Sequence, residues 1–113
     1  MEKTTDRFPI PATEDIRLAD VLKALADPHR LRIVESLADG GYRSAGAQGF
    51  DLPLQKSTMS HHLKVLREAG LTLTLMEGRT CSIALRREDL ESRFPGLLAA
   101  LTSPAALADL ERT

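Results

Sequence analysis

The chain has 113 residues, of which 42% are hydrophobic and 27% are charged. This balance is typical of one globular domain with a modest core, and it excludes disordered and membrane-embedded classes of protein. The net charge of −1 is unevenly distributed, because residues 55–87 hold six Lys and Arg residues against only two Glu. A basic middle between acidic ends indicates a localised anionic partner.

Cys81 is the single cysteine of the chain, so an internal disulfide and a Cys-only metal site within one chain are excluded. No run of apolar residues reaches the roughly 18 that a membrane span needs. Residues 1–15 also lack the apolar stretch of a signal peptide. We therefore expect a cytoplasmic protein that makes no contact with a membrane.

The first half of the chain predicts two helices after an irregular start. Residues 1–14 contain two prolines and no periodicity, so we expect a flexible N-terminal arm. Hydrophobic residues at helical spacing predict a first helix over 15–26. Asp27 is a good N-cap and Pro28 fits the first turn, so a second helix is predicted to run from there to about residue 38. Residues 40–54 contain four glycines and predict only a short, weakly specified helix.

The next segment, KSTMSHHLKVLREAGL over 56–71, predicts an amphipathic helix with a polar beginning. Its apolar residues Met59, Leu63 and Leu66 fall on one face of a helical wheel. Small or hydrogen-bonding side chains fall on or near the opposite face, so they should point outward. Gly70 is in a position to end the helix.

After this helix the hydrophobic period changes from 3.6 to 2, which predicts a two-stranded hairpin over 71–85. Glu77 and Gly78 supply its turn, and Arg79 lies near the tip. Cys81 falls on the inward side of the second strand, where we expect it to behave as a small buried hydrophobic residue.

The last part of the chain predicts two helical pieces over 88–101 that are broken at Pro95. Residues 103–113 are expected to form a tail or one short helix. The complete order is helix, helix, short helix, helix, hairpin, helix. This order predicts a mainly α fold with a small β-hairpin, the winged helix-turn-helix, with its domain over 15–102.

The polar beginning of the fourth helix fits contact with DNA. Such a helix enters the major groove by its N-terminal residues, and hydroxyls and backbone N–H groups there bind phosphate. We expect Ser57, Thr58 and Ser60 to contact phosphates, and His61 and Lys64 to reach base edges. The complete set of expected DNA-binding residues is Lys56, Ser57, Thr58, Ser60, His61, His62, Lys64, Arg67 and Arg79.

Three segments together resemble the arsenic-repressor (ArsR/SmtB) family of bacterial transcription regulators. They are LADPHRLRIVESLADG (25–40), STMSHHLKVLREAGL (57–71) and EGRTCSIAL (77–85). The resemblance implies a homodimer joined through its first and last helices, a recognition helix over 57–67 and a wing over 71–85. It also implies repression of a promoter that a bound signal, such as an unknown small-molecule effector, relieves. The expected dimer residues are Ile16, Leu18, Leu22, Leu97, Leu98 and Leu101.

The chain departs from the family where metal-sensing members carry their ligands. Those members have paired cysteines before the recognition helix, or Asp and His at fixed spacing in the last helix. Residues 40–52 contain no Cys or His, and residues 88–98 contain no His. A transition-metal site needs several thiolates or imidazoles, so we expect a regulator that senses no metal and holds no cofactor.

Other interpretations remain beside this one. His62 lies nearer the buried edge of its helix, so it is either a DNA contact or a packing residue. Cys81 would support a redox-responsive regulator if its thiolate were exposed. The fold could also serve as a protein-interaction module without DNA binding. An enzyme is not expected, because Ser60 and His61 have no Gly-x-Ser-x-Gly elbow around them and the chain has little room for a pocket.

Overall fold

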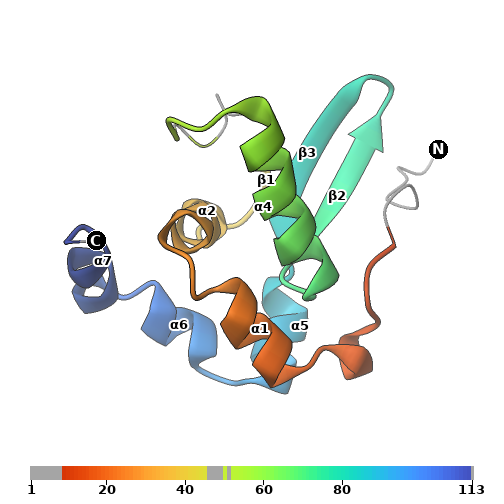
Figure 1. Cartoon of the computed structure of the whole chain (residues 1–113). Coiled ribbons are helices and arrows are strands. Elements are labelled where there is room, and N and C mark those ends of the chain that lie inside the picture. The colour runs from red at the N-terminus through yellow and green to blue at the C-terminus, as the bar shows by residue number, and fades with distance from the viewer. Residues whose placement is uncertain (1–8, 46–49, 51, 113) are drawn as a thin grey trace.

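Helices form most of the structure, and a small antiparallel sheet completes it (Figure 1). The computed structural model describes residues 9–45, 50 and 52–112. In chain order its elements are the 3-10 turn η1 (Thr13–Asp15), α1 (Leu18–Ala24), α2 (Pro28–Leu37), β1 (Tyr42–Ser44), α4 (Lys56–Glu68), β2 (Thr72–Glu77), β3 (Thr80–Leu85), α5 (Arg87–Arg93), α6 (Leu97–Leu101) and α7 (Pro104–Leu110). This order confirms the predicted mainly α fold with a β-hairpin.

The beginning of α2 is fixed by a side-chain cap, as the sequence predicts. The Asp27 carboxylate accepts hydrogen bonds from the backbone N–H groups of His29 at 2.8 Å and Arg30 at 3.2 Å. Pro28 occupies the first turn, where a missing N–H leaves no carbonyl unpaired. The helix ends at Leu37, and a glycine with a positive φ of 94° follows at position 40.

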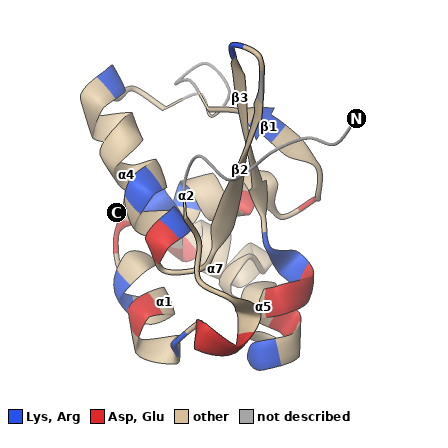
Figure 2. Cartoon of the chain, turned by 90° about the vertical axis from the view of Figure 1, so that its right-hand side faces the viewer, with Lys and Arg blue, Asp and Glu red and all other residues tan. Residues whose placement is uncertain are grey.

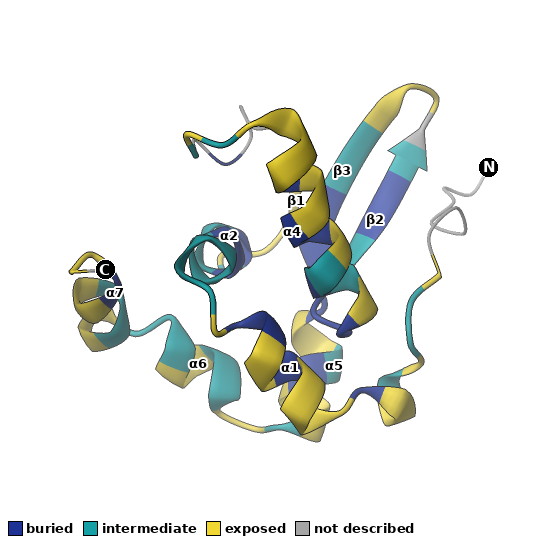
Figure 3. Cartoon of the chain, viewed as in Figure 1, coloured by how far each residue is buried: buried dark blue, intermediate teal, exposed yellow. Residues whose placement is uncertain are grey.

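The apolar faces of α2 and α4 meet in the core, and α4 also contacts α1 and β2. Val34 and Leu37 come from α2, and Met59 and Leu66 come from α4, each 2% exposed or less. Figure 3 shows α4 buried toward the molecule and exposed along its outer side. The rotation of α4 about its own axis is therefore set by its apolar stripe, as predicted.

The end of α4 is closed tightly against the segment that precedes α1. The backbone N–H of Leu71 donates to the Leu66 carbonyl at 3.0 Å, and Gly70 has a φ of 94°, which is the usual glycine-terminated end. A Cβ on Gly70 would lie 2.7 Å from Cγ1 of Ile16. Ile16 is 1% exposed within its own chain. Its expected place in a dimer surface is not supported, because its side chain is buried against Gly70 within the chain.

Within the described residues the sheet has three strands in the order β1-β3-β2, where the sequence predicted a two-stranded hairpin. The hairpin itself is confirmed, with Leu75 opposite Ser82. The added strand β1 pairs antiparallel with β3 and places Tyr42 opposite Ala84. All residues of β1 are exposed, so a three-residue strand has no hydrophobic alternation to reveal it. The short helix expected over 40–54 falls partly on residues outside the described ones.

Both faces of β2 contain buried residues, whereas a hydrophobic period of 2 indicates one buried face. Thr72 and Thr74 are 0% and 2% exposed, and Leu75 on the other face is 8% exposed. Cys81 is half-buried, not buried, because it lies beside the hairpin turn, where the strands extend past the core. Ile83 follows the prediction at 2% exposed.

The N-terminal segment is tied to α5, in contrast to the flexible arm expected over 1–14. Arg86 donates to the Pro11 carbonyl at 2.8 Å, and the Thr13 hydroxyl donates to Asp89 at 2.9 Å. The Arg86 guanidinium also pairs with Asp89 at 2.9 Å. The first helix begins at Leu18, after η1, instead of at residue 15. Residues 1–8 lie outside the described residues.

The C-terminal part follows the prediction closely. The break falls at Pro95 and Gly96, where Gly96 has a φ of 86°. The hydroxyl of Ser103 accepts from the backbone N–H of Ala106 and caps α7, which is a helix and not a tail. No helix among the described residues is both long enough and apolar enough to cross a bilayer.

The contact at Gly70 generates a stability prediction. Both Gly70→Ala and Gly41→Ala place a side chain at a positive φ, which costs roughly 1–2 kcal/mol. At Gly41 the new Cβ would meet nothing within 4 Å, whereas at Gly70 it would overlap Ile16, which adds about 1–3 kcal/mol. Urea denaturation should show a clearly larger loss of unfolding free energy for Gly70→Ala. Equal losses in the two variants would contradict the packing described above.

Candidate nucleic-acid interface

The outer face of α4 carries most of the residues that the sequence assigned to DNA (Figure 3). Its helical repeat turns them outward because the opposite stripe is buried. Arg67 is half-buried near the end of the helix. The fully exposed members are Lys56, Ser57, Thr58, Ser60, His61 and Lys64.

His62 is not part of that exposed face, since it is only 7% exposed. A guanidinium N–H of Arg30 donates to its Nδ1 across 3.2 Å, and its ring centroid lies 5.8 Å from that of His29. Adjacent residues on a helix diverge by about 100°, so His61 faces outward while His62 turns toward α2. The burial of His62 favours the packing interpretation over a DNA contact.

The beginning of α4 is built differently from that of α2. Its N-cap residue Gln55 makes no side-chain capping bond, and its first turn holds no acidic residue. Lys56 lies there instead, where a cation opposes the helix dipole. The first N–H groups of a helix need a partner from outside the helix. This arrangement suits an anion such as a phosphate.

The hairpin of β2 and β3 projects beside α4 (Figure 1). Its turn contains Gly78, whose φ is 62°, followed by Arg79, which is exposed. The tip of the two-stranded hairpin therefore carries a cation next to the polar face of α4.

Lys and Arg lie along α4 and at the hairpin tip (Figure 2). Asp and Glu are more frequent around η1, α1 and α5, where Lys and Arg also occur. Two of the six Lys and Arg residues in the basic segment 55–87 do not lie on α4 or at the hairpin tip. Arg86 is 6% exposed and paired with Asp89, and Arg87 lies on α5. The cations left on α4 and at the hairpin tip are Lys56, Lys64, Arg67 and Arg79.

The expected dimer residues fall into two groups in the single chain. Leu18 and Leu22 on α1 are 45% and 47% exposed, which is unusual for large apolar side chains spaced one turn apart. The leucines on α6 are partly buried against the core: Leu97, Leu98 and Leu101.

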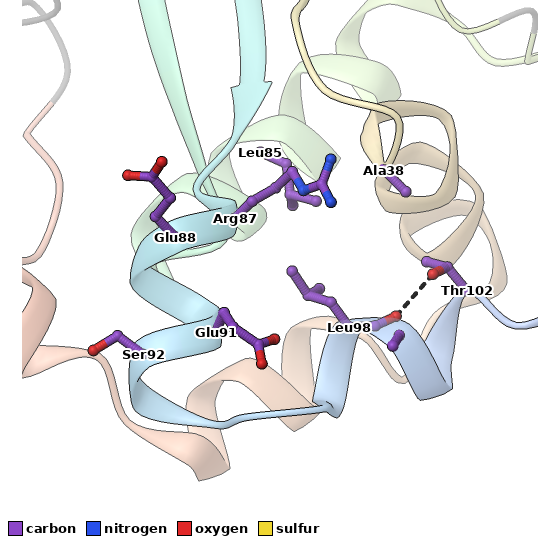
Figure 4. Close-up of a pocket in the computed structure, with 9 residues that line it drawn as sticks. Ala38, Leu85, Arg87, Glu88, Glu91, Ser92, Leu98 and Thr102 are labelled. Atoms are coloured by element: carbon purple, nitrogen blue, oxygen red, sulfur yellow. Dashed lines mark hydrogen bonds between the residues drawn. The ribbon is translucent and has the colours of Figure 1, made fainter.

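A crevice of about 780 Å³ lies between the end of α2, α5 and α6 (Figure 4). Arg87, Glu91 and Leu98 point into it. The crevice has the volume of a small-molecule pocket and mixes apolar walls with opposite charges. In the part of the chain that the structure describes, no three His, Cys, Asp or Glu are grouped to hold a metal ion.

The sequence gives no sign of the role of Arg30. Its Nε donates to the Ala24 carbonyl at 2.6 Å while its Nη1 reaches His62. The side chain thereby connects α1, α2 and α4. Its partners are 6 and 32 positions away in the chain. No local sequence pattern contains that information.

Comparison with known proteins gives consistent findings. A family model described as a helix-turn-helix domain matches residues 25–74, from the end of α1 into β2. The chain is 39% identical over 90 residues to the uncharacterized HTH-type transcriptional regulator YceK of Bacillus subtilis, covering 79% of this chain and 90% of the relative. It is 33% identical over 108 residues to a biofilm growth-associated repressor of Agrobacterium fabrum, covering 92% of each chain.

The fold is also similar to that of a solved structure, an ArsR-like transcriptional regulator from Rhodococcus sp. RHA1. The TM-score is 0.58 at 26% sequence identity, and the match covers 84% of this chain and 90% of the other.

Proposed function

The chain belongs to the ArsR family of winged helix-turn-helix transcriptional regulators, and from this we propose that it is a homodimeric repressor of a palindromic operator. Members of this family bind DNA, so the chain is a DNA-binding regulator. One observation carries the assignment of the surface: α4 exposes a polar, cationic face and begins without a cap or an acidic residue.

Each subunit is proposed to place the beginning of α4 in a major groove. Ser57, Thr58 and Ser60 contact phosphates there, together with the free N–H groups of the first turn. His61 and Lys64 lie one turn further along the exposed face, where side chains reach base edges. Lys56, Arg67 and Arg79 supply backbone contacts on either side.

The dimer is proposed to form through α1 and α6. Leu18 and Leu22 are exposed to water in the single chain. Their burial against a second copy would be favourable, because it removes apolar surface from water. Two copies related by a two-fold axis would place their α4 helices about 34 Å apart, roughly one turn of DNA. An imperfect palindrome with that spacing is the expected operator.

Repression is supported by the Agrobacterium relative, which is a biofilm growth-associated repressor. The crevice between α5 and α6 is the proposed place for a small-molecule effector that relieves it. Three statements stay predictions from the sequence: the regulator senses no metal, it holds no cofactor, and it is cytoplasmic.

The division between base and phosphate contacts can be tested with two alanine variants. His61→Ala should lower the preference for operator over random duplex by about 5- to 150-fold, the range for one base contact. Arg79→Ala should weaken binding to both duplexes and reduce the slope of log affinity against log salt by about one. Fluorescence anisotropy over a salt series measures both quantities.

Arg112→Ala is the matched control, because it removes an exposed cation after α7. It should leave the salt slope unchanged. If His61→Ala and Arg79→Ala both bound as the wild type does, α4 and the wing would be the wrong surface. No duplex binding even at low salt would favour the protein-interaction alternative.

The dimer surface can be tested with a charge at Leu22. Leu22→Glu should convert the dimer to monomers, because dimerisation would bury an unpaired carboxylate. Tyr42→Glu is the matched control, since Tyr42 is a similarly exposed apolar residue on β1, at 52%. Sedimentation velocity reports the mass of each variant. A Leu22→Glu protein that sediments as a dimer, or a Tyr42→Glu protein that becomes monomeric, would contradict the proposed interface.

A further inference from the structure

Arg30 joins three helices at the inner side of α4. Its Nε donates to the Ala24 carbonyl at the end of α1, across 2.6 Å. Its backbone N–H donates to the cap Asp27 at the start of α2, across 3.2 Å. Its Nη1 donates to Nδ1 of His62 in the middle of α4, across 3.2 Å. A hydrogen bond that ends on a histidine therefore adds to the apolar contacts that hold α4 against α1 and α2.

The chemistry of this bond requires a neutral His62. A guanidinium only donates hydrogen bonds and stays charged at all accessible pH values, so the imidazole nitrogen that it faces must accept. His62 therefore carries its proton on Nε2. A second proton would have to bind to Nδ1, which would remove the acceptor and place two cations in contact.

We propose that His62 is a proton-controlled positioning residue: neutral, it holds α4 in place for the operator, and its protonation releases α4, so that DNA binding weakens in mild acid. This inference rests on the proposed function, because α4 must be the element that contacts DNA. His62 lies on the inner side of α4, apart from the exposed residues that are proposed to contact the operator.

The surroundings of His62 favour its neutral form. Burial lowers the pKa of His62, the Asp27 carboxylate opposes this, and Arg30, His29 and His61 lower it further, so that it stays below the ordinary value of 6.5. On the other side of Arg30, α1 contributes Asp20 and Lys23 to a shallow cleft, and α4 contributes Glu68. These side chains give Arg30 neighbours of both signs, and the carboxylate that acts on His62 is that of Asp27.

The sign of the effect follows from the depressed pKa. The stabilising contribution of neutral His62 is complete above about pH 6.5 and is lost as the pH falls through the lower pKa of the folded state. Operator affinity is therefore expected to fall as the pH drops below 6.5.

The experiment measures operator affinity by fluorescence anisotropy from about pH 8.0 to 5.5 at constant ionic strength. Far-UV circular dichroism at each pH verifies that the helices persist. Wild-type affinity should fall as the pH drops, approaching about tenfold per pH unit for each protonated subunit, and hence about a hundredfold per unit for a dimer. His62→Gln, which keeps a neutral polar side chain, should flatten the profile.

His61→Gln is the matched control on the neighbouring exposed position. It should lose affinity at every pH, yet keep the fall of affinity in acid, because His62 is unchanged. A wild-type affinity that is constant or rises in acid overturns the proposal. A His62→Gln profile that matches the wild type overturns it as well. Absence of operator binding at pH 8.0 would instead reject the proposed function.

A second measurement uses the wild-type protein without DNA, so it does not depend on whether a variant folds. NMR of the protein with 15N- and 13C-labelled histidine should show His62 as the Nε2–H tautomer, titrating below pH 6.5. The amide signals of residues 57–64 should shift with the same midpoint. An Nδ1–H tautomer, a midpoint at or above 6.5, or α4 amides that ignore the titration would overturn the role of His62.

Discussion

The burial of one apolar stripe on α4 decides which of its side chains can meet another molecule. Met59, Leu63 and Leu66 enter the core that α2 and β2 share, and this burial fixes the rotation of the helix. The outer face then carries hydroxyls, His61 and cations, in place of the acidic residues that would stabilise a free helix beginning. The proposed function therefore depends on packing. A rotation of α4 about its axis by the angle between adjacent residues would bury His61 and expose His62.

The hydrogen bonds of Arg30 extend this constraint from α4 to the rest of the molecule. The same side chain contacts the end of α1 and His62 on α4, so α1 with its exposed leucines is linked to α4. Asp27 fixes the start of α2, from which Arg30 projects. The proposed dimer surface and the proposed DNA surface are thus joined inside the chain by the hydrogen bonds of one side chain.

The sequence predicted the features that arise from long periodic segments or from strong local chemistry. The 13-residue α4, the Asp27 cap and the hairpin all follow from local pattern. Features that depend on contacts between distant segments were missed. The strand Tyr42–Ser44 exists because β3 offers an edge, and Ile16 is buried because Gly70 leaves space for it. The burial of His62 could not be decided from the sequence, because it depends on where α2 lies relative to α4.

The central claim is that the outer face of α4 and the tip of the wing meet DNA. Amide chemical shifts of 15N-labelled protein, followed during titration with a duplex of about 20 base pairs at low salt, test it most directly. The largest changes are predicted in residues 56–64 and 78–80, with the amides of α7 nearly unchanged. Largest changes in α6, α7 or the crevice beside α5, together with silent α4 amides, would contradict the account.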